Sequence, residues 1–328
     1  MIAVDANGAD QGPGAVAEGA RRSGLATLLF GPAEALRDAG EVVDAPLKIR
    51  GDEEPAQAVR TKPDASIVQA ARAVAEGRAQ ALVSAGTTGP TLAASLLNVK
   101  RLPGVFRPAL AVLLPVPGGP TLLLDAGANV EVRPDMLVQF AYMGACLMES
   151  VHGMDRPRVG LLSVGEEERK GSPLTLEAHD KIAGGPLNFA GNVEGFDLPA
   201  ATVDVLVTDG FTGNVALKVL EGTSKALTAA IRDAIRSGAV SSLGGLLIRR
   251  RLGALRREID PEGVGGAILL GLRRPVVVAH GSFGSDGIAN AIRLARRAVD
   301  ERMVERTAEA LSAARALRSA PAASVAEP

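Results

Sequence analysis

The stretch from residue 203 to residue 222 constrains the fold more than any other part of the sequence. It reads VDVLVTDGFTGNVALKVLEG: an apolar run, a break at Asp209-Gly210, and then apolar residues at helical spacing. A buried strand, a short glycine turn and a helix make up one half of a βαβ unit. Ligands bind beyond the carboxyl ends of the strands in sheets built from such units. The stretch therefore predicts a parallel sheet whose ligand-binding edge carries Asp209, Gly210, Gly213 and Asn214.

Two interpretations of this turn remain open from the local residues. Gly213 would let the backbone approach a ligand closely, and the first amides of the following helix would favour an anion. The same residues would also serve as an ordinary strand-to-helix turn, with Asn214 as the N-cap of the helix. The turn by itself does not distinguish a ligand site from a structural turn.

The same alternation of apolar runs, glycine-containing turns and helical periodicity recurs along the chain. Strands are predicted at residues 2–4, 26–30, 81–83, 159–164, 187–190 and 275–279, with a weaker candidate at 47–49 and a hairpin joining 110–116 to 121–124. Helices are predicted at 15–23, 65–76 (capped by Asp64), 91–97, 134–149, 175–182, 288–297 and 303–317. This order predicts a doubly wound, Rossmann-like αβα sandwich over residues 1–317, followed by a disordered tail at 318–328.

Composition excludes several classes of protein. The 328 residues carry a net charge of −1 and only 2% aromatic side chains, which argues against a nucleic-acid-binding surface. A single cysteine, Cys146, excludes an intrachain disulfide framework, and we expect it to lie in the core. No signal peptide or membrane-spanning run is recognisable, so a cytoplasmic location is expected.

Polar residues and glycines follow most of the predicted strands, and we expect them to form one site along one edge of the sheet. The segment Ser84-Ala-Gly-Thr-Thr-Gly89 has the glycines and hydroxyls to cradle a phosphate, although it is not a P-loop. For each of these loops a plain turn or a solvated loop remains the alternative. The candidate binding residues are Asp5, Gly8, Asp10, Ser84, Gly86, Thr87, Thr88, Asn129, Glu166, Gly210, Gly213 and Gly281.

The chemistry of the site is narrowed by the motifs that the chain lacks. No G-x-S-x-G, H-E-x-x-H or C-x-x-C motif occurs, and no clear G-x-G-x-x-G opens a helix, so neither a serine hydrolase nor a zinc enzyme is favoured. We expect no metal and no cofactor. His152 is interpreted as a loop residue and His179 as a surface or helix-face residue, both without a chemical role. What remains are anion-binding loops with four candidate catalytic residues at three strand ends: Lys170, Asp209 with Asn214, and His280.

Residues 237–272 are interpreted as a helical, amphipathic insertion without a strand. Leucines here alternate with arginines, a pattern that fits a helix lying on anionic lipid and equally an acidic protein partner. An amphipathic helix packed on its own domain is the third interpretation, and residues 264–272 are expected at a tip or at a dimer contact. The candidate contact residues are Leu246, Leu247, Arg249, Arg250, Arg251, Arg256 and Arg257.

Eight segments in one order carry a resemblance to a known family: IAVDANGAD, SAGTTG, RPALA, LLDAGAN, VGEEERKG, NFAGNVEG, DGFTGNVALK and AHGS. From residue 2 to about residue 297 the chain resembles the acyl-(acyl-carrier-protein):phosphate acyltransferases of bacterial phospholipid synthesis. Two departures are visible. The family usually shows M-G-G-D-H where this chain has Asn7-Gly-Ala-Asp-Gln11, and Thr87 stands where asparagine is usual.

The resemblance implies that inorganic phosphate attacks an acyl thioester, giving an acyl phosphate and free acyl carrier protein. It implies a fold akin to phosphotransacetylases and isocitrate-dehydrogenase-like enzymes. It also implies a homodimer, peripheral association with the inner face of the cell membrane, and a downstream glycerol-3-phosphate acyltransferase as a possible partner.

The residues suggest roles that fit this chemistry. Phosphate is already anionic at neutral pH, so the enzyme needs to position it, stabilise an oxyanion and help the thiolate to leave. We expect Lys170 to neutralise the negative charge of the phosphate or oxyanion and Asn214 to donate a hydrogen bond to the oxyanion. His280 would donate a proton or hydrogen bond near the sulfur. Asp209 would orient one of the cations, while Ser84, Thr87 and Thr88 would bind phosphate or the pantetheine arm.

Three rival functions remain from the sequence. The nearest is a short-chain phosphotransacylase that uses acyl-CoA. A non-catalytic, lipid-associated scaffold belongs to a different class, with residues 237–272 as its functional part. A dinucleotide oxidoreductase on a similar sandwich is disfavoured because the glycine fingerprint is missing.

Overall fold

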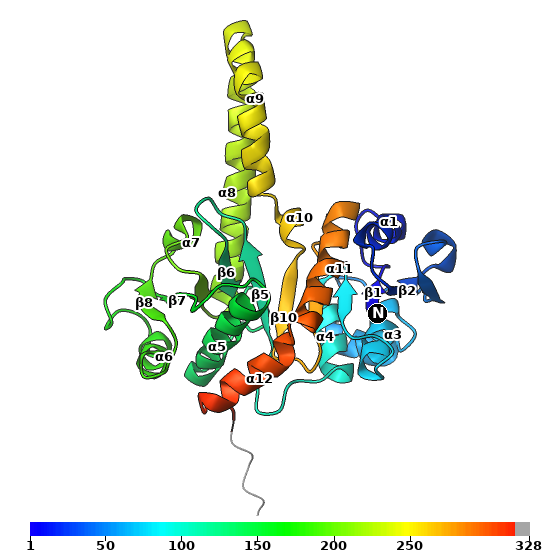
Figure 1. The fold of residues 1–328 in the computed structure, drawn as a ribbon, viewed down its shortest axis with the longest axis horizontal. Coiled ribbons are helices and arrows are strands. Elements are labelled where there is room, and N and C mark those ends of the chain that lie inside the picture. The colour runs from blue at the N-terminus through cyan, green and yellow to red at the C-terminus, as the bar shows by residue number, and fades with distance from the viewer. Residues whose placement is uncertain (319–328) are drawn as a thin grey trace, which may run out of the picture.

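A computed structural model describes residues 1–318 of the chain (Figure 1). Residues 319–328 of the predicted disordered tail lie outside the described residues. Arg318, the first residue of that tail, has its backbone N–H bonded to the carbonyl oxygen of Gly104 at 2.8 Å.

One mixed sheet of eleven strands runs through the molecule, in the order β3-β2-β1-β4-β11-β10-β5-β6-β9-β7-β8. The strands are β1 (Ile2–Asp5), β2 (Thr27–Gly31), β3 (Glu41–Asp44), β4 (Leu82–Ser84), β5 (Ala109–Leu114), β6 (Thr121–Leu124), β7 (Val159–Leu162), β8 (Phe189–Val193), β9 (Val205–Val207), β10 (Ala267–Leu270) and β11 (Val276–Val278).

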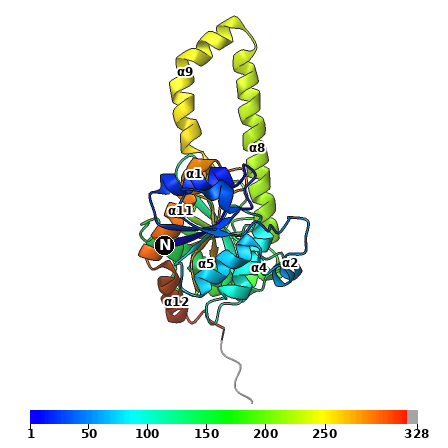
Figure 2. The same ribbon diagram turned by 90° about the vertical axis from the view of Figure 1, so that its right-hand side faces the viewer.

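Helices cover both faces of this sheet, as Figures 1 and 2 show. They are α1 (Pro13–Ser23), α2 (Pro55–Thr61), α3 (Ser66–Ala75), α4 (Thr88–Asn98), α5 (Pro134–Ser150), α6 (Pro173–Ala183), α7 (Asp197–Ala200), α8 (Gly210–Arg236), α9 (Ala239–Glu258), α10 (Pro261–Val264), α11 (Ser285–Asp300) and α12 (Met303–Ala313), with a 3-10 turn at Ala33–Leu36.

Alternate residues of each strand enter different cores. In β6, Leu122 and Leu124 belong to the core cluster that also contains residues of α1, α5, α11 and α12, whereas Leu123 belongs to the cluster with residues of α3, α4 and the start of α8. Because successive side chains of a strand point to opposite faces of the sheet, each such strand contributes side chains to both helix–sheet interfaces. The three-layer αβα sandwich predicted from the sequence is therefore confirmed.

The directions of the strands differ from the prediction. β1, β2, β4 and β11 pair in parallel, but β10 is antiparallel to both β11 and β5, and β6 is antiparallel to β5. β6, β9, β7 and β8 consequently run opposite to β1, β4 and β11. The expectation that all polar strand ends line one edge of one parallel sheet is wrong, because two antiparallel strands in the middle reverse the direction.

Other sequence interpretations also need correction. Residues 237–272 do contain a strand: β10 is buried in the middle of the sheet, so residues 264–272 are neither a tip nor a dimer contact. The edge strand is β3 rather than residues 47–49, and α2 was not predicted. The N-cap of α3 is Ala65 rather than Asp64.

Helices α8 and α9 form a hairpin that extends well beyond the sheet (Figures 1 and 2). Of the 27 residues of α8 only Gly210, Gly213 and Leu217 are buried. The two helices meet near the tip, where the hydroxyl of Ser242 donates to the carbonyl oxygen of Ile235 at 3.2 Å. None of the helices within residues 1–318 combines the length and apolar character that crossing a bilayer requires.

Candidate active site

The loops after β1 and β4 are joined by a buried hydrogen-bond network. The hydroxyl of Ser84 donates to Asp5 Oδ2 at 2.8 Å and accepts from Thr91 Oγ1 and from the amide of Gly86, both at 3.1 Å. Burial raises the pKa of Asp5, and hydrogen bonds to its carboxylate oppose that shift. Asp5 and Ser84 are 3% and 0% exposed. They hold the two loops in place, and their predicted contact with a ligand stays a prediction.

Glycines allow these two loops to touch. A Cβ atom added at Gly8 would overlap the Cα atom of Gly86, well inside the 3.0 Å limit that real Cβ atoms respect. Gly8 and Gly86 are therefore required for close approach of one loop to the other. Their predicted contact with substrate stays a prediction.

Helix α4 presents an open N-terminus beside these loops. Thr87 is its N-cap, but its side chain makes no capping hydrogen bond, and Thr88 is the first helical residue. Thr87 is exposed and Thr88 half-buried. The unpaired amides and positive dipole end of a helix attract an anion. The predicted binding of phosphate at Thr87 and Thr88 stays a prediction.

The loop after β11 adjoins the loop after β1. The amide of Asp10 donates to the carbonyl oxygen of Gly281 at 3.0 Å, and a Cβ atom added at Gly281 would lie 2.8 Å from Asp10 Oδ2. His280 is exposed, and its Nδ1 atom lies 2.8 Å from the hydroxyl of Ser282. The loops after β1, β4 and β11 thus form one contiguous surface, which we call the first polar group.

The loops after β6 and β9 form a second polar group around Asp125, a residue that sequence reasoning missed. Its carboxylate is 0% exposed and accepts from the amides of Leu110, Gly127, Ala128 and Asn129 at 2.8–3.1 Å, and from Asn129 Nδ2 at 2.7 Å. Burial raises the pKa of Asp125, and these hydrogen bonds act against it. The signal was present in the segment LLDAGAN, but only the folded loop shows that the acid organises it.

Two glycines fasten helix α8 onto this loop. A Cβ atom added at Gly213 would overlap the carbonyl oxygen of Asp125. The amide of Gly210 donates to the carbonyl oxygen of Asn129 at 2.8 Å. Gly213 therefore allows the helix to approach the loop after β6, where we had expected it to admit a ligand.

Asp209, rather than Asn214, is the N-cap of α8. Its Oδ1 accepts from the amide of Thr212 at 2.8 Å, and its Oδ2 accepts from the hydroxyl of Thr212 at 2.7 Å. Both carboxylate oxygens of Asp209 take part in the cap, and its predicted role in orienting a cation stays a prediction. A carboxylate at the cap also opposes an anion at this helix end. Asn214 is exposed and lies against Gly127.

The loop after β7 carries Lys170 and forms a third polar group. Lys170 and Glu166 are exposed, and neither makes an ion pair with another residue of the range 1–318. The backbone is fixed: the carbonyl oxygen of Lys170 accepts from Ser163 Oγ at 3.0 Å and from Asn192 Nδ2 at 3.3 Å. A free ammonium is thus held on an ordered loop.

His179 supports the Lys170 loop from the buried face of α6, so of its two expected positions the helix face is correct and the surface is not. It is 6% exposed, and its Nδ1 lies 3.0 Å from Asn192 Oδ1. Asn192 Nδ2 also donates to the carbonyl oxygen of Glu167 at 2.8 Å. His179 and Asn192 lie far from the loop in sequence, so no local pattern revealed this support.

The helical hairpin carries the other candidate residues. Leu246, Leu247 and Arg249–Arg251 are exposed on α9. Arg256 and Arg257 lie on the same helix, and their side chains are outside the described part of the structure. Cys146 is buried in α5, where burial first of all raises the pKa of its thiol, so the expected core role is confirmed.

Comparison with known proteins agrees with this architecture. The phosphotransacetylase of Streptococcus pyogenes superposes with a TM-score of 0.61 at 18% identity, covering 92% of this chain and 94% of that one. A branched-chain phosphotransacylase from Enterococcus faecalis gives 0.57 at 18% identity, covering 91% and 99%. At these identities the likeness establishes the fold.

Sequence comparison establishes the family. The profile of a family described as "Fatty acid synthesis protein" matches residues 1–306. The phosphate acyltransferase of Heliobacterium modesticaldum is 44% identical over 92% of this chain and 95% of its own length. That of an Anaeromyxobacter species is 42% identical over 100% and 95%. With that identity sustained across nearly its whole length, the chain is an acyltransferase and belongs to the phosphate acyltransferase family.

Proposed function

We propose that this enzyme transfers a long-chain fatty acyl group from acyl-(acyl-carrier protein) to inorganic phosphate. The observation that carries the proposal is the open N-terminus of α4 with Thr87 and Thr88, set among glycine loops in a member of this family. Phosphate bound there is already a nucleophile, so no strongly basic side chain is required. The product, an acyl phosphate, would serve phospholipid synthesis.

The twist of the sheet supports a shared site for strands that run in opposite directions. Adjacent strands in a twisted sheet rotate by roughly 20–25°, so the seven steps from β1 to β7 accumulate about 140–175°. A rotation of that size nearly cancels the reversal of direction. The carboxyl ends of β1 and β7 would then open toward the same side, with the first and third polar groups facing a common space.

The proposed reaction follows from this arrangement. A phosphate oxygen attacks the thioester carbonyl carbon, the carbonyl oxygen gains negative charge, and the carbon–sulfur bond then breaks to release the carrier thiolate. Lys170 would neutralise the phosphate or oxyanion, and Asn214 would donate to the oxyanion. His280 would supply a proton or hydrogen bond to the departing sulfur. Asp209 caps α8, and its role in orienting a cation stays a prediction.

Donor preference tests the proposed function. We expect purified enzyme with labelled phosphate to form palmitoyl phosphate from palmitoyl-(acyl-carrier protein), with acetyl-CoA and butyryl-CoA at least about 100-fold poorer in kcat/KM. The products are followed by mass spectrometry. Equal use of the short-chain CoA esters would favour the phosphotransacylase alternative. Absence of acyl phosphate with every donor would favour the scaffold.

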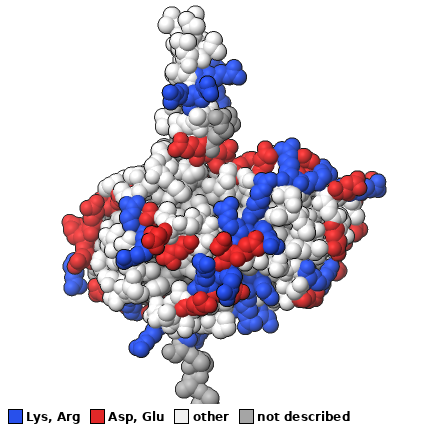
Figure 3. All heavy atoms as spheres, in the orientation of Figure 1, with Lys and Arg blue, Asp and Glu red and all other residues white. Residues whose placement is uncertain are grey.

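The tip of the α8–α9 hairpin is proposed to contact an anionic membrane surface at the inner face of the cell membrane. Val240, Leu246 and Leu247 are 86%, 62% and 78% exposed. Figure 3 shows a tip free of charged side chains, with Lys and Arg gathered behind it. Apolar groups that enter the headgroup region, followed by cations that meet anionic lipid, are the arrangement of a peripheral membrane anchor. There the product would be released close to a glycerol-3-phosphate acyltransferase that consumes it.

Vesicle binding tests this surface. The double variant Leu246→Glu, Leu247→Glu is expected to bind phosphatidylglycerol vesicles about 100-fold more weakly, since each leucine loses roughly 1.5 kcal/mol of apolar burial. Sedimentation with vesicles measures the effect, and Ser241→Glu, more than one turn before Leu246 on the same helix, provides a charge control. If vesicle binding were unchanged while the KM for acyl carrier protein rose, the surface would belong to the carrier protein.

Homodimer formation is proposed along α8. Val215, Val219, Leu227 and Ile231 are 46–61% exposed and follow one another at multiples of four residues, which makes an apolar ridge along the helix. A second copy of the chain would bury that ridge. Leu227→Glu is expected to produce a monomer in sedimentation velocity, whereas Lys225→Glu on another side of the helix should leave the dimer intact. A monomeric parent protein would contradict the proposal.

A further inference from the structure

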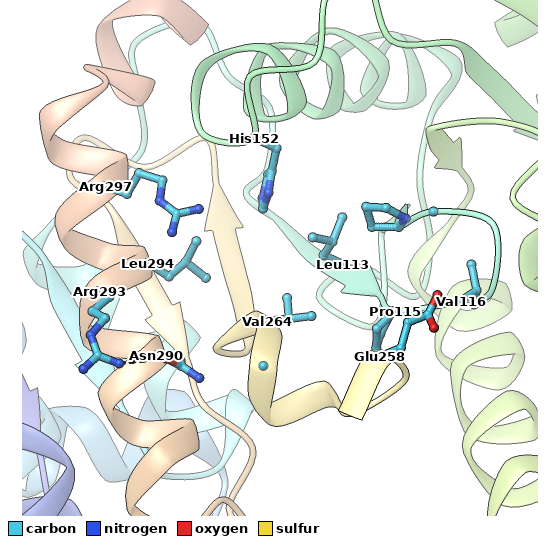
Figure 4. Close-up of a pocket in the computed structure, with 13 residues that line it drawn as sticks. Leu113, Pro115, Val116, His152, Glu258, Val264, Asn290, Arg293, Leu294 and Arg297 are labelled. Atoms are coloured by element: carbon cyan, nitrogen blue, oxygen red, sulfur yellow. Dashed lines mark hydrogen bonds between the residues drawn. The ribbon is translucent and has the colours of Figure 1, made fainter. Parts of the chain in front are cut away.

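A cavity of about 420 Å³ lies between the β5–β6 hairpin, the base of α9, α10 and α11 (Figure 4). None of the candidate catalytic residues lines it. Its volume falls within the roughly 300–1,000 Å³ of small-molecule sites. Most of its wall is apolar, with Leu113, Val264 and Leu294 among the lining side chains.

One end of the cavity is cationic. Arg297 and His152 point into the same space in Figure 4. Within residues 1–318 Arg297 makes no ion pair or side-chain hydrogen bond, and Arg296 pairs with Asp300. Arg293 also lines the cavity without an ion pair, but its guanidinium donates to Asn290 Oδ1 at 3.0 Å and to the carbonyl oxygen of Arg22 and is not directed into the cavity in Figure 4. Burial, and then the charge of Arg297, lowers the pKa of His152 to about 4, so its ring is neutral at pH 7. The arginine therefore provides an unmatched positive charge, and the neutral ring an adjacent hydrogen-bonding group.

The opposite end of the cavity carries Glu258, as Figure 4 shows. A ligand with a negative charge at both ends would meet repulsion there. A ligand with one anionic head and an apolar tail matches the charge at the Arg297 end and the apolar walls between the two ends. Arg297 is the arginine directed into the cavity in Figure 4, and a single such charge fits a monoanion better than a phosphate, which brings more charge.

We propose that this cavity binds a long-chain fatty carboxylate, with its head at Arg297 and His152 and its tail along Leu113, Leu294 and Val264. The site is separate from the candidate active site. Binding here would let the enzyme respond to free fatty acid without blocking phosphate or the thioester.

Displacement of cis-parinaric acid from the full-length protein tests the proposal. Palmitate should displace the fluorescent probe, while acetate, inorganic phosphate and hexadecanol should be at least about tenfold weaker. Arg297→Gln should weaken palmitate binding by about tenfold or more, because a charge-assisted hydrogen bond is lost. Arg296→Gln, one residue away on the same helix and already paired, is the matched control and should bind palmitate normally.

Two further results would overturn the proposal. Displacement of palmitate by saturating phosphate, or its loss in Lys170→Ala, would place the fatty chain in the active site. Equal binding of hexadecanol and palmitate, with no change in Arg297→Gln, would show an apolar surface without an anion site. A thermal melt of each variant shows whether it is folded, so that a loss of binding is not mistaken for unfolding.

Discussion

Lys170→Ala is expected to lower kcat/KM for phosphate by about 100-fold or more, the usual effect of removing one group that stabilises a developing oxyanion. The ammonium of Lys170 has no ion-pair partner within residues 1–318, and its loop is fixed through Ser163 and Asn192. An ammonium group on a loop fixed in this way can bind an anionic ligand without first breaking an ion pair or rearranging the loop. Steady-state kinetics at varied phosphate concentration measure the effect.

Two variants control this experiment. Lys225→Ala removes an exposed lysine from α8 and should leave kcat/KM unchanged. Lys170→Arg keeps the charge and should recover part of the lost activity, since the two cations differ in shape and reach. Full turnover by Lys170→Ala would remove this residue from the mechanism.

Gly213→Ala is expected to destabilise the fold by several kcal/mol, within the upper range for single substitutions. The added methyl group would overlap the carbonyl oxygen of Asp125, a backbone atom that cannot rotate away. Relief would require α8 to move off the loop after β6, and with it Asn214. Thermal or urea unfolding should show a clear loss of stability, with activity reduced in whatever protein remains folded.

Gly222→Ala on the same helix is the matched comparison. Nothing lies within 4 Å of a Cβ atom at Gly222. Alanine there should stabilise the helix by about 0.5–1 kcal/mol, because glycine carries the larger entropic cost in a helix. Equal effects of the two substitutions would contradict the packing role given to Gly213.

Local sequence patterns predicted the strand–turn–helix units well, because apolar runs and the helical spacing of apolar residues are properties of neighbouring residues. Residues 203–222 became β9 and α8 as expected, and residues 110–124 became a β-hairpin. Local patterns could not predict that β3 lies at the edge of the sheet or that β10 lies in its middle. Strand order depends on pairing between distant segments, and β10 pairs with β5 and β11.

The residues of the candidate site show the same difference between local features, which the sequence predicts, and long-range contacts, which it does not. The exposed residues Lys170, Asn214 and His280 were proposed from their places after strands, and their catalytic roles stay predictions. The residues that hold them were missed or misassigned, because their roles rest on contacts over long sequence separations. Asp125 binds the amide of Leu110, and His179 acts through Asn192. Gly213 was read as a ligand contact because nothing in the sequence shows that the carbonyl oxygen of Asp125 fills that space.

A double-mutant cycle between Thr88→Val and Lys170→Ala tests most directly whether the first and third polar groups share one phosphate. Residues that touch the same ligand are coupled, by roughly 0.5–3 kcal/mol, whereas distant independent sites add within about 0.5 kcal/mol. We predict that the two substitutions together lower kcat/KM for phosphate by less than the product of their separate effects. Strictly multiplicative effects, like those of the pair Thr88→Val and Lys225→Ala, would show that the two loops do not meet at a common substrate.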